Sequence, residues 1–535
     1  MSAALSWRDR FFLSWLASST SSSSSPHLRP IPGDSSTSVE SLLTQFHPCD
    51  VEVTISKGLR GLVASRDVKV GDVLLEVPFR ACLGDVVEAE INTEPPFTES
   101  PRWAEALPWN VRLATLALKE RERQSSFLGS WPESPVELCM CASTDSLTEY
   151  AQDESVASEA VFVSMWVQEQ YVQAKAAASG AGEPFPWSEE DWLWALTHVG
   201  SRVLNVESGA SRFGECRLLV PCLDLANHEA VPSALYAFSA ASSCGPAVRL
   251  IAARDLRAGE PVTLTYGQRT NDHMAQYYGF VPSANPNDVV LVSLRQVLQA
   301  ATSSGSAAAA AFPTGWRAAC DAAEAALARH DRPSSDLGLR SGGPDEALVL
   351  ALRCALASSS EEADALLRLA DSGIVDEEED EEEEDGEEEK TQNQVARDVA
   401  SLLAEACAQL EASYPTSIEE DEALLRGHWE VASSGASSGR KEGEAYDDDS
   451  TPRSRLATGV PLLVELRLSR KQLLRQLGGS MRSVASEPRT AHRKLCSLQQ
   501  SEGRVDDLYP SLNRTDLNTW TTLPWDWEQR AYAVL

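Results

Sequence analysis

Two short apolar runs near the middle of the chain each lead into polar side chains that could do chemistry. The runs at 218–220 and 262–265 have the composition of buried strands. The residues of interest that follow them are Asp224, Asn227, His228, Tyr266, Gly267 and Asn271. A glycine beside a strand-end tyrosine allows the backbone to approach a ligand closely. We therefore expect the two clusters to meet in one active site when the chain folds back on itself.

The motifs of the common cofactor and metal sites are absent from the sequence. No GxGxxG follows a strand, and neither GxxxxGK[ST] nor HExxH occurs. The segment GASSG at 435–439 has the letters of a serine-hydrolase motif, but it lies in a Ser/Gly-rich stretch without strand or helix pattern. The eleven cysteines include no CxxC spacing, so we expect no metal site and a reducing compartment.

Charge is unevenly distributed along the chain. The formal net charge is −34, and the run at 376–389 alone holds 13 acidic residues. An acidic surface argues against binding to nucleic-acid phosphate or to anionic lipid, and it favours a basic protein partner. No window of eighteen consecutive apolar residues occurs, so we also expect no membrane span.

The N-terminal half of the chain changes from β to helical pattern and back. Residues 1–40 are rich in Ser and poor in acids, which is typical of either a transit peptide or a disordered extension. Short strand patterns with Gly-containing turns at 51–56 and 62–78 indicate a small, curled β architecture. A helical pattern at about 97–210 interrupts it, and the β pattern returns at 216–294.

The C-terminal half has a different character. Residues 296–343 are rich in Ala, Ser and Gly, as in a low-complexity linker, whereas 344–480 has the periodicity of amphipathic helices. One of these helices is expected at 468–479, ending at a glycine pair. The acidic run at 376–389 is expected to be a solvated loop within this helical region. The tail at 481–535 has no pattern that assigns a structure.

Several motifs in a fixed order resemble the SET domain. Its C-terminal half is resembled by LDLANH (223–228), LTYGQRTND (264–272) and YYGF (277–280), and its N-terminal half by GLRGLVASRDVKVGDVLLEVP (58–78). The specific likeness is to methyltransferases of the Rubisco large-subunit type. Their substrate-binding domain is resembled by YPTSIEEDEALL (414–425) and VELRLSRKQLL (464–474). The likeness extends over roughly residues 40–480.

The resemblance implies a fold and a reaction. The implied fold is α+β: a knotted, β-rich SET domain at 41–295 with a helical insert at about 97–210, followed by an all-α substrate-binding domain at 344–480. The implied activity is that of a protein methyltransferase with S-adenosyl-L-methionine as cofactor and methyl donor. The partner implied is a protein substrate, with no nucleic acid and no membrane.

The resemblance also assigns roles to individual residues. Tyr266 corresponds to the catalytic tyrosine. The residues that correspond to cofactor contacts are Gly58, Gly61, Leu62, Arg202, Asp224, Asn227, His228 and Tyr266. Among these, the positions from Gly58 to Leu62 correspond to a loop over the cofactor. The residues that correspond to the wall of the substrate channel are Leu204, Leu223, Tyr278 and Phe280.

Each of these residues also has a purely structural interpretation. A strand-end tyrosine such as Tyr266 is commonly a half-buried core residue, and an Asn-His pair commonly forms a turn. Arg202 could serve only as an ion-pair partner, while Tyr278 and Phe280 could belong to the core. The ordered set of motifs favours the functional interpretation for Tyr266 and the Asn-His pair, and it leaves the alternatives open for the other three.

The sequence favours lysine over histidine as the methylated side chain. Relatives that methylate histidine have a polar residue shortly after the insert arginine and a Trp just before the Asp of the Asn-His motif. This chain has Leu204 and Leu223 at those places, and an apolar pocket suits the methylene stem of a lysine better than an imidazole. No Cys-rich segment follows the Tyr-Gly pair, so we expect a non-histone protein as substrate.

Two alternatives of function stay open from the sequence. One is protein-histidine methylation, and the other is a catalytically silent adaptor that keeps the fold and binds partners. We expect a monomer that works inside the cell, in the cytoplasm or nucleus. If residues 1–40 are a transit peptide, the compartment is instead the chloroplast or the mitochondrion.

Overall fold

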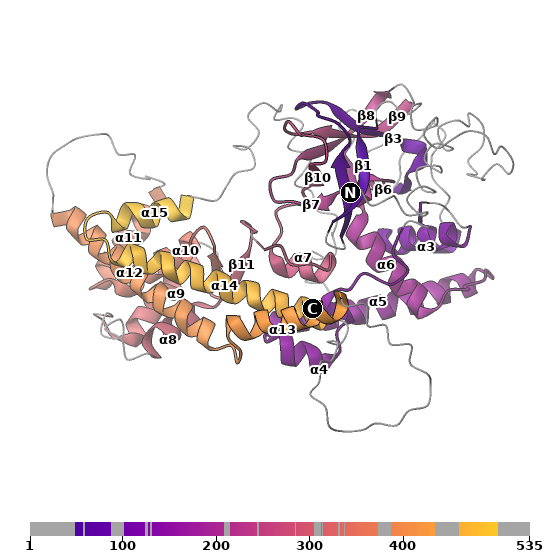
Figure 1. Ribbon diagram of the computed structural model, residues 1–535. Coiled ribbons are helices and arrows are strands. Elements are labelled where there is room, and N and C mark those ends of the chain that lie inside the picture. Colours follow the sequence, from indigo (N-terminus) through magenta and orange to yellow (C-terminus); the bar gives the residue numbers. More distant parts are fainter. Residues whose placement is uncertain are drawn as a thin grey trace.

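The computed structural model describes most of the chain between residues 49 and 500. The described ranges are 49–56, 59–86, 101–123, 127–128, 131–207, 215–242, 245–283, 285–303, 312, 314–329, 332–335, 337–372, 387–433 and 459–500. The extension at 1–40, Gly58, the acidic residues 376–386 and the segment after residue 500 lie outside them. Figure 1 shows the described elements as a strand-rich part adjoined by a helical part.

The strand-rich part contains three small sheets. The first has the order β1 (Val51–Ser56), β2 (Leu59–Ala64), β10 (Pro261–Leu264) and β7 (Asn227–His228). The second has the order β3 (Val73–Pro78), β9 (Gly245–Ala252) and β8 (Ala234–Ser242), and the third has the order β4 (Leu83–Val86), β6 (Glu215–Leu219) and β5 (Leu204–Glu207). The β segments expected at 51–56, within 62–78 and at 216–294 are therefore confirmed in outline.

The first sheet brings the two polar clusters together. Strand β10 pairs with β7 in parallel, with Thr263 opposite Asn227 and Leu264 opposite His228. The same strand pairs antiparallel with β2 on its other side, where Val262 lies opposite Leu62. The segments that end in the Asn-His pair and in Tyr266 are thus neighbours, as the sequence predicts.

Three long helices form the insert between the β segments. They are α3 (Trp109–Glu122), α5 (Glu154–Gly180) and α6 (Glu189–Arg202), with the short α4 (Thr144–Ser146) before α5. Helix α6 begins with a capping box in which the Ser188 side chain accepts from the Asp191 N–H and the Asp191 carboxylate accepts from the Ser188 N–H. This helix ends at Arg202, which places that residue at the edge of the β core.

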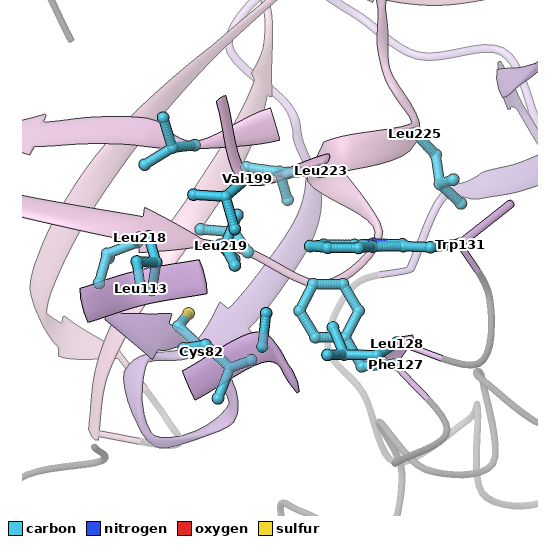
Figure 2. Packing of buried hydrophobic residues seen from close by; sticks show 14 of the residues in the cluster. Cys82, Leu113, Phe127, Leu128, Trp131, Val199, Leu218, Leu219, Leu223 and Leu225 are labelled. Carbon is cyan, nitrogen blue, oxygen red and sulfur yellow. The ribbon is translucent and has the colours of Figure 1, made fainter. Parts of the chain in front are cut away.

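Indole and aliphatic side chains fill the space between the insert and the sheets. Trp131 and Trp192 are almost fully buried, and the strand residues Leu218 and Leu219 have no exposed surface. Figure 2 shows Trp131 lying between Phe127 and the segment that carries Leu223. The insert is therefore part of the same hydrophobic core as the sheets, and it can fix the position of residues at the sheet edge.

A second core lies in the C-terminal part. Its helices are α8 (Leu294–Ser303), α9 (Trp316–Arg329), α10 (Glu346–Leu356), α11 (Ser360–Ser372), α12 (Glu387–Ala412), α13 (Ile418–Ser433), α14 (Val460–Ala485) and α15 (Ala491–Gln500). A two-stranded sheet of β11 (Val289–Val292) and β12 (Leu337–Arg340) joins it. The expected α+β class is confirmed.

Three expectations for this half were wrong. Residues 296–343 are not a linker, since α9 and β12 lie there and Ala323 and Leu327 are buried in helical cores. The helix expected at 468–479 is only part of α14, which continues past Gly478 to Ala485. A Cβ atom at Gly478 would lie 3.2 Å from the Cβ of Cys407, so this glycine permits close packing of α14 on α12. The last acidic residues of the run, 387–389, begin helix α12 instead of lying in a loop.

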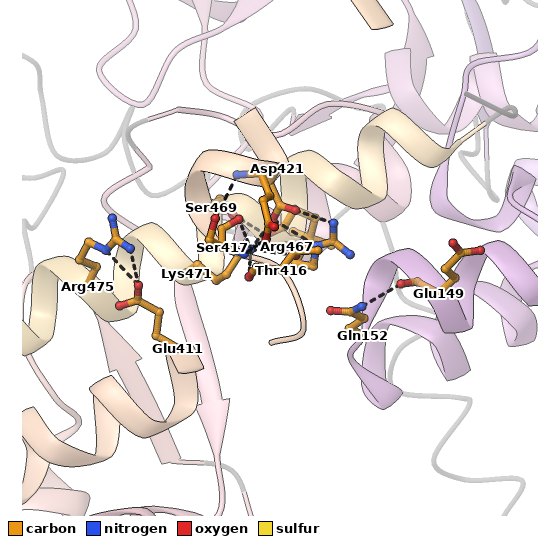
Figure 3. A network of polar contacts seen from close by, with 12 residues as sticks. Glu149, Gln152, Glu411, Thr416, Ser417, Asp421, Arg467, Ser469, Lys471 and Arg475 are labelled. Carbon is orange, nitrogen blue, oxygen red and sulfur yellow. Dashed lines mark hydrogen bonds and ion pairs between the residues drawn. The ribbon is translucent and has the colours of Figure 1, made fainter. Parts of the chain in front are cut away.

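A buried polar cluster joins α13 to α14. Asp421 Oδ2 of α13 accepts a hydrogen bond from Arg467 Nε at 3.2 Å, and its Oδ1 accepts one from Arg467 Nη2 at 2.6 Å. Lys471 Nζ lies 2.5 Å from the same Oδ2. Lys471 also donates to the Thr416 carbonyl and hydroxyl (Figure 3). The two sequence motifs that resemble the substrate-binding domain are the two halves of this cluster.

Two observations limit the kinds of site that the described ranges contain. Every described helix is too short or too polar to cross a membrane. Among the described residues, no group of three or more His, Cys, Asp and Glu side chains is arranged to hold a metal ion.

Candidate active site

A pocket opens where the end of helix α6 meets the Tyr266 segment. Its walls come from α6 and β5, from the segment before the Asn-His pair, from β8, and from the residues after β10. The lining residues are Ser201, Arg202, Val203, Leu204, Asn205, Leu223, Asp224, Ala226, Tyr236, Leu264, Thr265, Tyr266, Gly267, Arg269 and Tyr278. Elements that are far apart in the sequence thus line a single cavity.

An opposite-charge pair lies at one side of the pocket. Arg202 Nε is 4.0 Å from Asp224 Oδ2, which is too far for a hydrogen bond but close enough for a strong charge interaction. The Asp224 carboxylate instead accepts a 2.8 Å hydrogen bond from Trp131 Nε1, and the Arg202 guanidinium lies over the same indole ring at 5.3 Å. Trp131 therefore orients both charges.

Burial perturbs this pair in opposite directions. The side chain of Asp224 is only 1% exposed, and burial raises its pKa, opposed by the charge of Arg202 and the Trp131 hydrogen bond. Burial likewise lowers the pKa of Arg202, opposed by Asp224. Asp224 Oδ1 and Arg202 Nε are both buried without a hydrogen-bond partner. They are polar groups that a ligand in the pocket could satisfy.

Tyr266 also lines the pocket, and its hydroxyl is held in place. The hydroxyl donates a 2.9 Å hydrogen bond to the Ala226 carbonyl, while the Tyr266 N–H donates to His228 Nδ1 at 3.1 Å. Its ring stacks on Tyr278 with centroids 5.0 Å apart and planes at 28°. Burial raises the pKa of the Tyr266 hydroxyl well above its ordinary value, so the group stays protonated at neutral pH.

The Asn-His pair supports the Tyr266 segment from behind. Asn227 Nδ2 donates to the Arg60 carbonyl at 3.1 Å, and a Cβ atom at Gly61 would lie 2.5 Å from that amide nitrogen. Gly61 is therefore needed for the close approach of β2 to the Asn227 side chain. Burial lowers the pKa of His228 to about 4, so its imidazole is neutral and accepts from the Tyr266 N–H.

The predicted site residues fall into three groups by position. Those that line the pocket are Arg202, Leu204, Leu223, Asp224, Tyr266 and Tyr278. Those that lie behind the lining are Gly61, Leu62, Asn227, His228 and Phe280. Gly61 and Leu62 were expected in a loop, but they lie within strand β2, and Leu62 is buried opposite Val262. Gly58 lies outside the described residues.

Sequence reasoning missed four polar or aromatic residues at the pocket. Trp131 orients the charge pair, and the Tyr236 hydroxyl donates to the Asn205 carbonyl at 3.1 Å. Asn205 Oδ1 and Arg269 Nε are buried without a hydrogen-bond partner. Asn205 and Arg269 lie one and three residues from predicted site residues, so proximity in sequence was an available signal. Trp131 had none, because it meets Asp224 across 93 residues of chain.

Two family models match the chain, and together they account for both cores. The model described as the SET domain matches residues 59–267, and the one described as Rubisco LSMT substrate-binding matches residues 320–474. The chain combines a SET domain with a Rubisco LSMT-type substrate-binding domain. The pocket lies in the SET domain, and the Asp421 cluster lies in the substrate-binding domain.

Several curated proteins are similar to this chain at low identity. Protein SET DOMAIN GROUP 40 of Arabidopsis thaliana is 24% identical over 75% of this chain and 78% of its own length. The chloroplastic Rubisco large subunit N-methyltransferase of Nicotiana tabacum is 26% identical, over 45% of this chain and 49% of its own length. The actin-histidine N-methyltransferase of Canis lupus familiaris is also 26% identical, over 44% of this chain and 40% of its own length.

One solved structure is similar along nearly the whole chain. The structure of Rubisco LSMT bound to AdoMet superposes with a TM-score of 0.50, covering 95% of this chain and 100% of that one at 18% sequence identity. The likeness shows that the two parts of the fold occur together in a known arrangement.

Proposed function

We propose that this protein is an S-adenosyl-L-methionine-dependent protein-lysine N-methyltransferase that acts on a non-histone protein. The observation that carries the proposal is the Tyr266 hydroxyl: it faces the pocket, stays protonated, and donates its single hydrogen to Ala226. Tyr266 lies within the residues matched by the SET domain, and it shares the pocket with a charge pair that has unsatisfied polar atoms. The family resemblance of the site motifs supports the same assignment.

The donor groups of the pocket fit S-adenosyl-L-methionine. The amino-acid end of that cofactor carries an ammonium and a carboxylate, and Asp224 Oδ1 and Arg202 Nε are buried partners of the matching charges. The absent side chain at Gly61 keeps β2 close to Asn227 behind the pocket. Arg202 and Asp224 would hold the cofactor, and Asn227 and His228, behind the lining, would keep the neighbouring Arg60 and Tyr266 segments in place. When bound, it supplies a methyl group on a sulfonium sulfur.

The stacked rings of Tyr266 and Tyr278 form one wall of the pocket, called the tyrosine wall below, which can select and orient a neutral amine. Because the Tyr266 hydrogen is already donated to Ala226, the hydroxyl oxygen can act only as an acceptor towards an N–H of the substrate. This contact would direct the amine's own lone pair along the pocket, and alignment of this kind contributes to catalysis. His228 is neutral, so it places no positive charge beside the amine.

A lysine must also release its ammonium proton to solvent before it can accept the methyl group. A free lysine has a pKa of about 10.4, so its neutral form costs roughly 4 kcal/mol near pH 7.4. Desolvation among apolar side chains favours the neutral amine, and Leu223, Leu204 and the stacked ring of Tyr278 supply such surroundings. The apolar lining at Leu204 and Leu223 is also the reason to propose lysine.

Histidine methylation is the second candidate. Asn205 lines the pocket directly after Leu204, and its unpaired Oδ1 could accept from an imidazole N–H. The similarity to the actin-histidine N-methyltransferase gives this candidate independent support. A catalytically silent adaptor is a third possibility, and it predicts cofactor binding without turnover.

The deciding experiment compares three versions of the purified protein. Wild type, Tyr266→Phe and Tyr171→Phe are incubated with radiolabelled S-adenosyl-L-methionine and cell lysate, and modified residues are identified by mass spectrometry. Tyr171→Phe is the matched control, since its hydroxyl donates to the Trp187 carbonyl away from the pocket. We expect wild type and control to label lysine, and Tyr266→Phe to lose most of the labelling.

Three outcomes would change the assignment. Equal labelling by Tyr266→Phe would remove this tyrosine from the mechanism, and labelled histidine would establish the second candidate. Binding of S-adenosyl-L-homocysteine in calorimetry without any labelling would favour the adaptor. If S-adenosyl-L-homocysteine does not bind at all, the proposed methyltransferase activity and the proposed cofactor are both refuted.

We further propose a location inside the cell and a monomeric state. Nine cysteines among the described residues are free thiols, which fits a reducing compartment. A C-terminal fluorescent fusion, with and without residues 1–40, distinguishes cytoplasm or nucleus from chloroplast or mitochondrion. Light scattering of the purified protein tests the monomer.

A further inference from the structure

One side chain of the substrate-binding domain reaches into the SET domain and is almost fully buried there. Arg470 of α14 is 4% exposed. Its Nε donates to Asp272 Oδ1 at 3.1 Å, its Nη2 donates to Asp272 Oδ2 at 2.5 Å, and its Nη1 pairs with Asp153. One guanidinium thus holds two carboxylates from two different elements of the other domain.

Asp272 belongs to the segment that forms the tyrosine wall of the pocket. It is the second residue of the short helix α7 (Asn271–Tyr277), which connects Tyr266 to Tyr278. The start of α7 is also held from within the SET domain, because the Asn271 N–H donates to Asp288 Oδ1 at 2.9 Å. A displacement of α7 would therefore move Tyr278, which follows the helix directly and stacks on Tyr266.

Asp153 performs a separate task at the other end of the ion pair. Its Oδ1 accepts from the N–H groups of Ser155 and Val156, so it caps the long insert helix α5. Burial alone would raise the pKa of Asp153, but Arg470 and these hydrogen bonds hold it below the ordinary value. Arg470 therefore ties α7 to the N-terminus of α5.

The geometry of this contact makes it specific for arginine. Two nitrogen atoms face the two oxygens of Asp272, while a third faces Asp153. A planar guanidinium can serve both carboxylates at once, whereas a lysine ammonium acts as a point charge. Without the cation, two partly buried carboxylates would be left close together and would repel each other.

We propose that Arg470 is a positioning residue, through which the substrate-binding domain fixes the tyrosine wall of the methyl-transfer pocket. The domain then has a second role besides holding a substrate: the pocket geometry depends on its correct docking. The catalytic consequence rests on the proposed function, whereas the ordering of α7 does not.

The test compares variants of the full-length protein. Arg470→Met removes the charge and keeps an unbranched side chain, Arg470→Lys keeps the charge, and Asp272→Asn removes only the α7 partner. Arg475→Met is the matched control on the same helix, because Arg475 is half-exposed and pairs with Glu411 inside its own domain. If Arg470→Met fails to fold, Arg470→Lys and Asp272→Asn carry the test.

Two measurements separate positioning from general loss of stability. Hydrogen exchange of peptides spanning 264–280 should be faster by about tenfold or more in Arg470→Met and Asp272→Asn, and unchanged in Arg475→Met. The kcat for methyl transfer should fall by about tenfold to a hundredfold in the same two variants, with the affinity for S-adenosyl-L-homocysteine nearly unchanged. Arg470→Lys should lie between them and wild type.

Specific outcomes would overturn the inference. Exchange at 264–280 equal to that of Arg475→Met would show that Arg470 does not order α7. A kcat loss accompanied by an equal loss of cofactor-binding sites would indicate only a smaller folded fraction. If wild type transfers no methyl group, the proposed function fails, but the exchange comparison still decides whether Arg470 positions the wall.

Discussion

Replacement of Asp421 by Ala should strongly destabilise the substrate-binding domain. Asp421 has no exposed surface, and it is the counter-ion of two buried cations, Arg467 at 2% and Lys471 at 1% exposure. Removal of one partner of a buried ion pair costs about 3–5 kcal/mol, because the remaining charge loses its compensation. Arg467 would lose both of its hydrogen bonds to the carboxylate. Lys471 would keep contacts to Thr416 and Ser417 oxygens.

These contacts set the expected size of the effect. We expect Asp421→Ala to lower the free energy of unfolding by about 4 kcal/mol. The reason is that Arg467 is left with almost no partner, whereas Lys471 keeps part of its contacts. Urea denaturation followed by circular dichroism at 222 nm measures this free energy in the transition assigned to the substrate-binding domain. Glu411→Ala is the control, since its pair with the half-exposed Arg475 should contribute less than about 1 kcal/mol.

A second variant tests the reasoning from the opposite direction. Simultaneous replacement of Asp421 by Leu and of Arg467 and Lys471 by Met removes every charge of the cluster. Buried ion clusters replaced by apolar residues of similar volume are often neutral or stabilising, so this triple variant should be more stable than Asp421→Ala. Two results would refute the assigned role of the charges. One is that Asp421→Ala lowers the free energy of unfolding by less than about 1 kcal/mol, and the other is that the triple variant is less stable than Asp421→Ala.

Three further changes have expected results. Burial raises the pKa of Asp288 to about 6, so the folded protein binds this proton more tightly than the unfolded chain and wild-type stability falls as pH rises from about 4 to 6. Asp288→Asn should lack that fall and be more stable by about 2–3 kcal/mol at pH 7, as measured by urea denaturation across pH. Gly61→Ala should displace the Asn227 amide, cost about 1–3 kcal/mol, and weaken S-adenosyl-L-homocysteine binding in calorimetry. Ser188→Ala should cost about 1 kcal/mol in thermal unfolding through loss of the helix cap; no change would show that the capping box is not formed in solution.

The convergence of the two polar clusters could be predicted because each follows a strand with a distinctive motif. The parallel pairing of β7 with β10 brings Asn227 next to Thr263, three residues before Tyr266. A capping box such as that at Ser188 can be recognised from sequence in the same way, because it depends only on residues within one turn. Local patterns thus identified the elements and the motif residues of the pocket.

The remaining parts of the pocket depend on packing between distant segments. Trp131 contributes through an indole N–H directed at Asp224, and no periodicity near residue 131 marks that contact. Composition was misleading in helix α9, since alanine is frequent in low-complexity segments and is also the best helix former. Gly478 resembles a helix stop, but in α14 it permits close approach to α12. A tertiary contact decided each case.

The link from Arg470 to Asp272 has a consequence for how the protein is made. The partners are 198 residues apart, and all residues that line the pocket precede α14 in the chain. At a synthesis rate of about 5–20 residues per second, Asp272 leaves the ribosome roughly 10–40 seconds before Arg470 does. During that interval the SET domain can fold while its two acceptor carboxylates still lack their cation. On the proposed role of Arg470, the pocket of a nascent chain reaches its final geometry only after α14 has been translated. A message that ends before codon 470 would yield a SET domain without the cation that pairs with Asp153 and Asp272.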